Sequence, residues 1–234
     1  MVYGELIVAG SAGSAPGPIA PCSGYLIRKQ GFELLLDLGP GASMTLQRHV
    51  DPADVDAVIL SHGHSDHWAD LTQMFRLRVD RTTEPLPAIG PAAMSEWLDD
   101  HGFAYMQASA EPRALGPVRV RQAQVQHGDV ECWATRLDDA LCFTADTEPC
   151  EALDDLAAGV GVLLAEACGS DTNGPMPGHL TAGDAARLAA RSGVRLLVLT
   201  HMRPWDDHAA LLAEAAAIAP CPVIAAVPDL RVAL

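Results

Sequence analysis

The sequence predicts a mixed α+β and α/β fold in which two β-sheets pack against each other and helices cover their outer faces. Three observations lead to this prediction. Hairpin-like strands follow one another early in the chain, strands alternate with helices later, and polar residues recur where strands end. A doubly wound parallel sheet is disfavoured, because its successive strands need a crossover helix between them.

The strand and helix predictions follow from the lengths of the apolar runs and from the turn residues that bound them. Strands are expected at 6–10, 32–39, 56–62, 117–127, 131–137, 141–146, 160–167, 194–201 and 221–227. Helices are expected at 42–50, 148–159, 181–193 and 206–219. Since no internal repeat, charged tail or low-complexity linker interrupts this order, we expect a single domain over residues 1–234.

Composition indicates a protein of the cytoplasm. Residues 1–10 are typical of a short strand rather than a signal peptide, because they lack a basic leader. No segment approaches the ~18 to 20 apolar residues of a membrane span. The six cysteines lack CxxC spacing, which favours reduced, mostly buried thiols over disulfides or a sulfur-ligated metal. We therefore expect a cytoplasmic protein without a membrane partner.

The formal net charge of −15, with Lys29 as the only lysine, argues against a long nucleic acid as partner. Such a surface repels a phosphate backbone unless arginines are concentrated locally. Arg76, Arg78 and Arg81 form the one such concentration, and a solvated helix end also explains them. A small-molecule substrate is the favoured partner.

Metal-seeking side chains are concentrated in "VILSHGHSDHWAD", residues 58–70. His62 and His64 are two apart in an extended turn, where both can point the same way, and Asp66 and His67 follow. Two neutral imidazoles and one further ligand make a good zinc site, while a carboxylate and another imidazole begin a second site beside it.

Polar residues also stand at or near the ends of several other predicted strands. They are Asp37, His127, Asp146 and His201. Strand ends present side chains rigidly, so this recurrence indicates a site built at one edge of the sheets.

The HxHxDH pattern resembles the signature of the metallo-β-lactamase fold superfamily. The resemblance implies a four-layer αββα sandwich with two metal ions at one edge of the paired sheets. Carried over residue by residue, it assigns one zinc ion to His62, His64 and His127, the other to Asp66, His67 and His201, and a bridging role to Asp146. Mn²⁺ and Fe remain alternatives to zinc.

Two further residues bear on this resemblance. Asp37 matches a position where a carboxylate can hydrogen-bond a ligating histidine, although a helix cap for residues 42–50 also explains it. Ala145 stands where the family often has glycine, and we expect an alanine there only if the backbone does not need a positive φ.

Two metal ions about 3.5 to 4 Å apart would generate a bridging hydroxide at neutral pH, which predicts hydrolysis. The fold alone does not choose among lactams, thioesters, lactones and phosphodiesters. His179, in "GHLT", falls after Asp146 and so resembles the His-x-Thr histidine of the phosphodiesterase branch, a proton donor at the scissile phosphate. Glu166 resembles the glutamate that orients it. The alternative is a loop histidine that caps the helix beginning near Thr181.

Within that branch the chain resembles small actinobacterial-type phosphodiesterases of cyclic nucleotides more closely than tRNA 3′-processing endonucleases. The latter carry an RNA-gripping arm where this chain has only residues 128–145. Ser11 and Gly13 belong to a Gly/Ser/Pro loop that could approach a phosphate through backbone N–H groups, or could be an ordinary connection. Trp68 and Trp205 could stack on a base, or pack in the core.

Three rival functions stay open at this point. The same site could open a lactone, thioester or lactam in metabolic tailoring. A redox-active diiron protein of this fold would have glutamate where His64 stands. A metal-stabilised binding module without turnover is the third. Family members are often dimers, so a homodimer is also possible by analogy.

Overall fold

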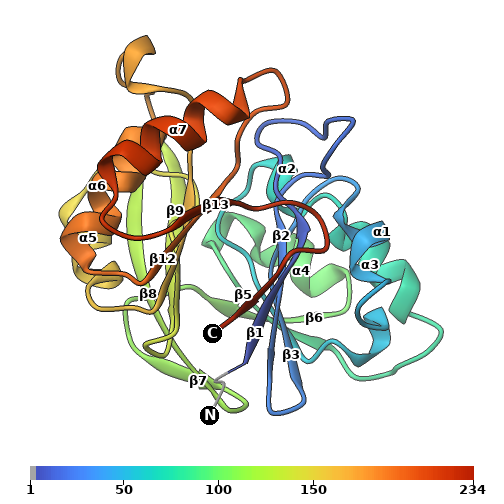
Figure 1. The fold of residues 1–234 in the computed structure, drawn as a ribbon. Helices are drawn as coiled ribbons and strands as arrows, with labels where there is room; N and C mark the ends of the chain where they lie inside the picture. The colour runs from blue at the N-terminus through green and yellow to red at the C-terminus, as the bar shows by residue number, and fades with distance from the viewer. Residues whose placement is uncertain (1–3) are drawn as a thin grey trace.

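The computed structural model describes residues 4–234, so residues 1–3 of the predicted first strand lie outside it. Two seven-stranded sheets pack face to face, with helices on both outer sides (Figure 1), which confirms the predicted architecture. In spatial order the first sheet contains β14 (Arg231–Ala233), β1 (Glu5–Gly10), β2 (Gly24–Lys29), β3 (Phe32–Leu38), β4 (Ala57–Ile59), β5 (Leu86–Gly90) and β6 (Phe103–Gln107). The second contains β13 (Val223–Ala225), β12 (Leu196–Thr200), β11 (Val162–Glu166), β10 (Leu141–Phe143), β9 (Val130–Leu137), β8 (Val118–His127) and β7 (Arg113–Leu115).

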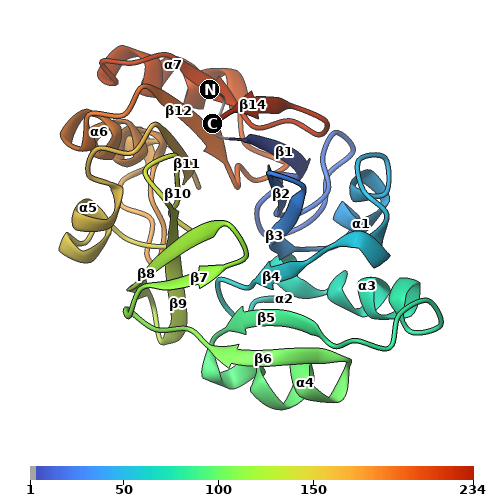
Figure 2. The same ribbon diagram turned by 90° about the horizontal axis from the view of Figure 1, so that it is seen from below.

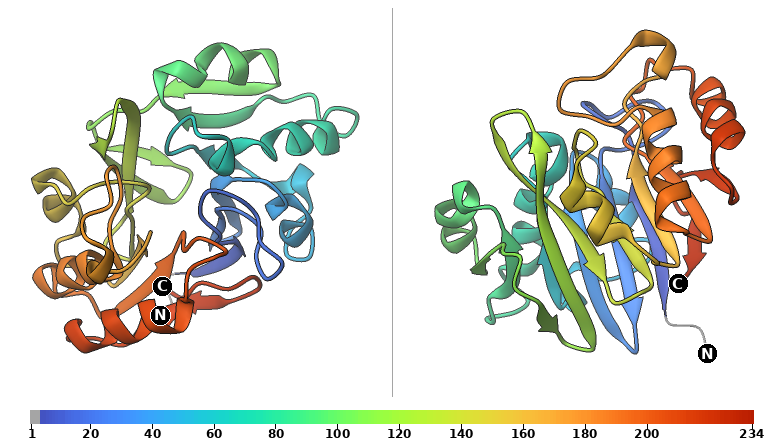
Figure 3. Two further views of the ribbon diagram at one scale, coloured as in Figure 1. Left: turned by 90° about the horizontal axis from the view of Figure 1, so that it is seen from above. Right: turned by 90° about the vertical axis from the view of Figure 1, so that its left-hand side faces the viewer.

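The helices fall into two groups, one on each outer face (Figure 2). The first sheet is covered by α1 (Ala42–Leu46), α2 (Ser65–Trp68), α3 (Leu71–Arg78) and α4 (Ser95–Asp100). The second is covered by α5 (Glu151–Ala157), α6 (Ala182–Ser192) and α7 (His208–Ile218). Both groups are also separated in the views of Figure 3. Within residues 4–234, no helix is both long and apolar enough to cross a membrane.

The central strands are apolar on both faces because both faces are buried. In β1, Leu6 and Val8 point into the core between the sheets, while Ile7 packs on the helix side of the first sheet. Successive strand residues point to opposite faces, so a strand covered on both sides needs a continuous apolar run. This explains why "LIV" and "LLL" are recognisable as strands from sequence.

Several parts of the fold differ from the sequence predictions or were absent from them, among them β2 and α2, which the sequence did not assign. The helix predicted at 42–50 ends as an α-helix at Leu46 and continues only as turns. The chain between residues 71 and 115 contains helices and strands that the sequence did not assign. After β13, which was predicted to be the last strand, β14 pairs antiparallel with β1 of the other sheet. Three residues with one buried side chain carry too little periodicity to reveal that pairing.

Parallel pairing brings several strand ends to one edge of the molecule. β3 runs parallel to β4 in the first sheet, and β10, β11 and β12 run parallel in the second. Parallel neighbours finish on the same side, so the residues that follow these strands are brought close together. No disulfide joins the six cysteines, all of which lie within the described part of the chain.

Tyr25 links the two sheets beneath this edge. Its fully buried hydroxyl lies 2.6 Å from the Thr200 Oγ1 atom at the end of β12. We expect Tyr25→Phe to lower the free energy of unfolding by about 1–3 kcal/mol, because Thr200 loses a buried partner. Tyr105→Phe is the control, since its partly exposed hydroxyl is 3.4 Å from the Gly90 carbonyl. Urea unfolding measures both; equal losses would contradict the special role of Tyr25.

Candidate metal centre

The strands that supply the site end in unusual backbone conformations. Asp37, Ala145 and His201 have φ values of 55°, 54° and 54°, in the left-handed region that favours glycine. The expectation that alanine stands at 145 only without a positive φ is therefore wrong. A left-handed alanine costs about 1–2 kcal/mol, which the surrounding buried structure offsets. The strained turns direct Asp37, Asp146 and His201 toward a common point at the sheet edge.

One group of ligand atoms comes from His62, His64, His127 and Asp146, all within 4.8 Å of one another. The His64 Nδ1 atom lies 3.1 Å from His62 Nε2 and 3.0 Å from His127 Nε2. Tetrahedral zinc with Zn–N bonds of about 2.0–2.1 Å separates its nitrogen ligands by roughly 3.3 Å. The three imidazoles therefore fit a metal ion with little movement.

A second group comes from Asp66, His67 and His201. The Nε2 atoms of His67 and His201 are 3.2 Å apart, and Asp66 Oδ2 is 3.3 Å from His201 Nε2. Asp146 faces this group too, with Oδ1 3.4 Å from His67 Nε2 and Oδ2 3.4 Å from His201 Nε2. Asp146 belongs to the first group and lies within 3.4 Å of two nitrogens of the second, so it lies between the two groups, where a bridging carboxylate would be.

Hydrogen bonds on the far sides of the rings orient these histidines. The Asp37 carboxylate lies 2.7 Å from His67 Nδ1 and accepts from both the backbone N–H and the hydroxyl of Ser61 at 2.8 Å. His127 Nδ1 is 2.7 Å from the Gly178 carbonyl. An Nδ1–H donated outward leaves the Nε2 lone pair directed at the metal site. Ser61 and Gly178 were missed from sequence, because a serine and a loop glycine carry no specific signal.

The pKa shifts at Asp146 and His62 suit a cation, whereas at His67 and His201 burial lowers the pKa but Asp146 and the other neighbouring carboxylates together raise it more. Although burial raises the pKa of Asp146, His201 and His67 outweigh it and hold that pKa well below 3.8. Burial and the neighbouring His67 lower the pKa of His62 well below 6.5. An ionised carboxylate beside a neutral imidazole offers two of the lone-pair donors that zinc prefers.

His179 and Glu166 form a third group of ligand atoms with Asp146 and His201, all within 4.8 Å of one another, and His179 pairs with Glu166 in it. Its Nδ1 atom is 2.9 Å from Glu166 Oε2 and 3.8 Å from Asp146 Oδ2. Glu166 is buried and also accepts from the Thr147 backbone N–H at 2.6 Å. Burial lowers the pKa of His179, but the hydrogen bond and charge of Glu166 raise it more, so the net shift is upward from 6.5. The cap of α6 is made by Thr181 itself, which leaves His179 without that role.

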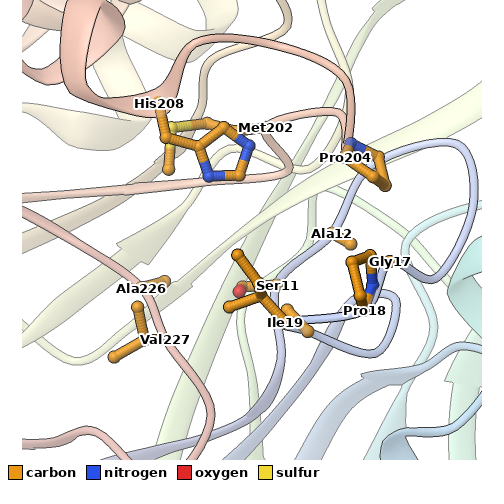
Figure 4. A pocket seen from close by; sticks show the side chains of 11 residues that line it. Ser11, Ala12, Gly17, Pro18, Ile19, Met202, Pro204, His208, Ala226 and Val227 are labelled. Carbon is orange, nitrogen blue, oxygen red and sulfur yellow. The ribbon is translucent and has the colours of Figure 1, made fainter.

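The loop after β1 packs directly on the second group. The Ser11 backbone carbonyl accepts a hydrogen bond from the His201 backbone N–H at 2.8 Å. Ser11 also lines a small apolar cavity of about 60 Å³ (Figure 4). The Ser14 backbone N–H donates to Asp66 Oδ2 at 2.9 Å. A Cβ atom added at Gly13 would lie 2.3 Å from the His201 carbonyl oxygen and 2.8 Å from its Nδ1 atom. This loop therefore braces two of the candidate ligands.

The two tryptophans are placed differently from each other. The Trp68 ring centre lies 4.9 Å from that of Trp97, and its indole N–H donates to the Gly63 carbonyl. Trp68 therefore supports the turn between His62 and His64. Trp205 is 65% exposed, with the Arg203 guanidinium 5.7 Å from its ring centre. Trp205 is the more exposed of the two, and Trp68 is partly buried.

We expect Gly13→Ala to weaken zinc binding by about 10- to 100-fold, the usual effect of disturbing a residue behind a metal ligand. The new methyl group would displace His201. Gly63→Ala is the matched control: it lies between His62 and His64, yet its Cβ would meet only Met94, at 3.7 Å. Zinc titration against a competing chelator measures both affinities. An unchanged affinity in Gly13→Ala would show that the loop does not hold His201 in place.

Two packed sheets with a histidine–aspartate cluster at their shared edge define the class of metallo-hydrolases with the β-lactamase fold. Residues 33–202 match the family described as the beta-lactamase superfamily domain, and this chain belongs to that family. The superfamily membership predicted from the HxHxDH pattern is thereby confirmed.

Sequence relatives cover nearly the whole chain. "Uncharacterized protein Rv1339" of Mycobacterium tuberculosis is 36% identical, over 96% of this chain and 90% of the relative. "Probable metallo-hydrolase YhfI" of Bacillus subtilis is 29% identical, over 90% of this chain and 92% of the relative. A ribonuclease Z of Nocardia farcinica is also 29% identical, over 88% of this chain and 90% of the relative.

Solved structures agree in fold. The crystal structure of Bacillus subtilis YhfI, described as a metallo-beta-lactamase fold protein, superposes with a TM-score of 0.90 at 26% identity, covering 98% of both chains. A diphosphatase from the PhnP family superposes with a TM-score of 0.84, over 99% of this chain and 98% of that one. Its identity of 19% shows a shared fold alone.

Proposed function

We propose that this protein is a dinuclear zinc-dependent phosphodiesterase of the cytoplasm that acts on a small, cyclic nucleotide. The His179–Glu166 pair carries the proposal, because it adds a proton donor to two groups of metal ligands that both face Asp146. Phosphodiester hydrolysis requires an oxygen nucleophile, positive charge around the phosphate and a proton for the leaving alkoxide. Zinc ions, when bound, supply the first two at neutral pH.

Under this proposal, each residue of the site has a defined role. Glu166 accepts from His179 Nδ1, which leaves the Nε2 atom on the opposite side of the ring to carry the proton for the leaving oxygen. The carboxylate also favours the protonated form of that imidazole. Asp37 holds His67 in one tautomer and orientation through its Nδ1 atom. Asp66, braced by Ser14, completes the second ligand group.

A small substrate is supported by the chain between His127 and Asp146. Residues 128–145 contain only β9, β10 and tight turns, so nothing there extends toward an RNA. The net charge of −15 also opposes a long polyanion. One relative is named ribonuclease Z, and we propose that this chain differs from it in taking a substrate that enters a pocket rather than a groove.

The proposal is tested by assaying the zinc-loaded protein on a panel. The substrates are 3′,5′-cyclic nucleotides, bis(4-nitrophenyl) phosphate, a precursor tRNA, a lactoyl thioester, a lactone and a chromogenic lactam. We expect turnover of the first two substrates only, with the cyclic nucleotide preferred. Faster turnover of the thioester, lactone or lactam would assign a different bond, and cleavage of the tRNA would overturn the small-substrate assignment.

A further inference from the structure

A cavity of about 390 Å³ adjoins the candidate metal centre at His179. His179 lines this cavity and also belongs to the cluster with Asp146, Glu166 and His201. Pro149, Met176 and Pro177 provide an apolar part of the wall. We call this cavity the His179 pocket. Of the residues in the three ligand groups, His179 is the one that also lines this cavity.

The charged part of the wall is acidic. Glu148, Asp171 and Asp184 line it together with Arg187. Arg187 donates to both Asp171 oxygens, at 2.7 and 3.1 Å, and to Asp184 at 2.6 Å. The single guanidinium is thus already shared by two carboxylates, and three carboxylates against one arginine leave the wall with a surplus of negative charge.

The fold holds these carboxylates in place. Glu148 accepts the Gly178 backbone N–H at 2.7 Å, next to His179. Asp171 accepts from the Thr181 hydroxyl, and its carboxylate is so close to the start of α6 that a Cβ at Gly183 would lie 2.2 Å from it. These contacts hold the carboxylates in the pocket wall, so an incoming anion meets their negative charge there.

We propose that the His179 pocket is the leaving-group subsite and that it selects leaving groups without negative charge, such as a nucleoside, against those that carry a further phosphate. This inference rests on the proposed function and deepens it. A cyclic mononucleotide has one phosphate, which the metal centre takes, and a neutral nucleoside remains for the pocket. A polynucleotide or a diphosphate would place a second phosphate against Glu148 and Asp171, where like charges repel.

Binding to the zinc-loaded protein tests the subsite without requiring turnover. The ligands are adenosine 5′-monophosphate and adenosine 3′,5′-bisphosphate, which differ by one phosphate, and calorimetry measures both affinities. We expect the bisphosphate to bind the wild-type protein about 10-fold more weakly. Glu148→Gln retains an oxygen that can accept from the Gly178 backbone N–H. It should reduce the difference in affinity between the two nucleotides by about 3- to 10-fold.

Glu151→Gln is the matched control, because it removes the same charge three residues later, on the exposed start of α5 and outside the pocket wall. Equal effects of the two variants would show a bulk charge effect and overturn the inference. Tighter binding of the bisphosphate to the wild-type protein, or no binding of either nucleotide, would overturn it as well. A clear affinity gap without phosphodiester turnover would instead retain the subsite and reject the proposed reaction.

Discussion

His179→Ala should reduce turnover of a cyclic nucleotide by about 10²- to 10⁴-fold, the usual contribution of a positioned proton donor. Bound zinc should stay at about two ions per chain, as in other two-metal sites. The reason is geometric: His179 Nδ1 is committed to Glu166 at 2.9 Å, and neither the group around His62 nor the group around His67 includes its ring. Steady-state kinetics and metal analysis of the same preparations measure both quantities.

The leaving group provides a sharper readout of this role. An alkoxide needs a proton to depart, whereas 4-nitrophenolate departs readily without one. His179→Ala should therefore lose much less activity on bis(4-nitrophenyl) phosphate than on a cyclic nucleotide. His101→Ala is the control, because the His101 ring stacks on Trp97 with ring centres 4.3 Å apart and belongs to none of the ligand groups. Loss of a zinc ion from the His179 variant, or equal losses on both substrates, would contradict the assignment as proton donor.

Asp146→Asn should remove most zinc binding and, with it, activity on every substrate. Asp146 is buried and faces both ligand groups, lying within 4 Å of five histidine nitrogens. The substitution removes the carboxylate charge that both metal ions would share. Substituting a residue that only hydrogen-bonds a metal ligand weakens metal binding by about 10- to 100-fold, and we expect a larger loss of zinc affinity here. The increase in free energy of unfolding that zinc causes should shrink in parallel.

Asp139→Asn serves as the control for this variant, because Asp139 lies on the exposed turn after β9 and its side chain is 73% exposed. Metal analysis after dialysis, together with urea unfolding with and without added zinc, measures the two effects. Retention of two zinc ions by Asp146→Asn would show that the bridging assignment is wrong.

Most of the candidate site could be located from sequence because its residues follow strands. Five of the seven proposed ligands lie at strand ends or in the turns that follow them, Asp66 and His67 lie in the short helix α2 just after such a turn, and the structure brings all seven together. The HxHxDH spacing is local, so it shows which residues project together without any knowledge of the fold. The sandwich was equally accessible, since its strands are short apolar runs buried on both faces.

The parts that could not be predicted depend on contacts between distant segments. The left-handed backbone at Ala145 contradicts its local preference and persists because the structure around it is packed. β14 is too short to specify that it returns to the first sheet. Neither feature has a signal within a few residues of itself.

By itself, the sequence determined that this chain forms a two-sheet metallo-hydrolase fold with its metal-seeking residues at the strand ends. Periodicity and motif spacing are properties of neighbouring residues and need no tertiary information. Only the tertiary structure decided that Gly13 packs on His201 and that an acidic wall borders His179. These contacts join segments far apart in the chain, and their distances are set by how the sheets and α6 pack rather than by local preference.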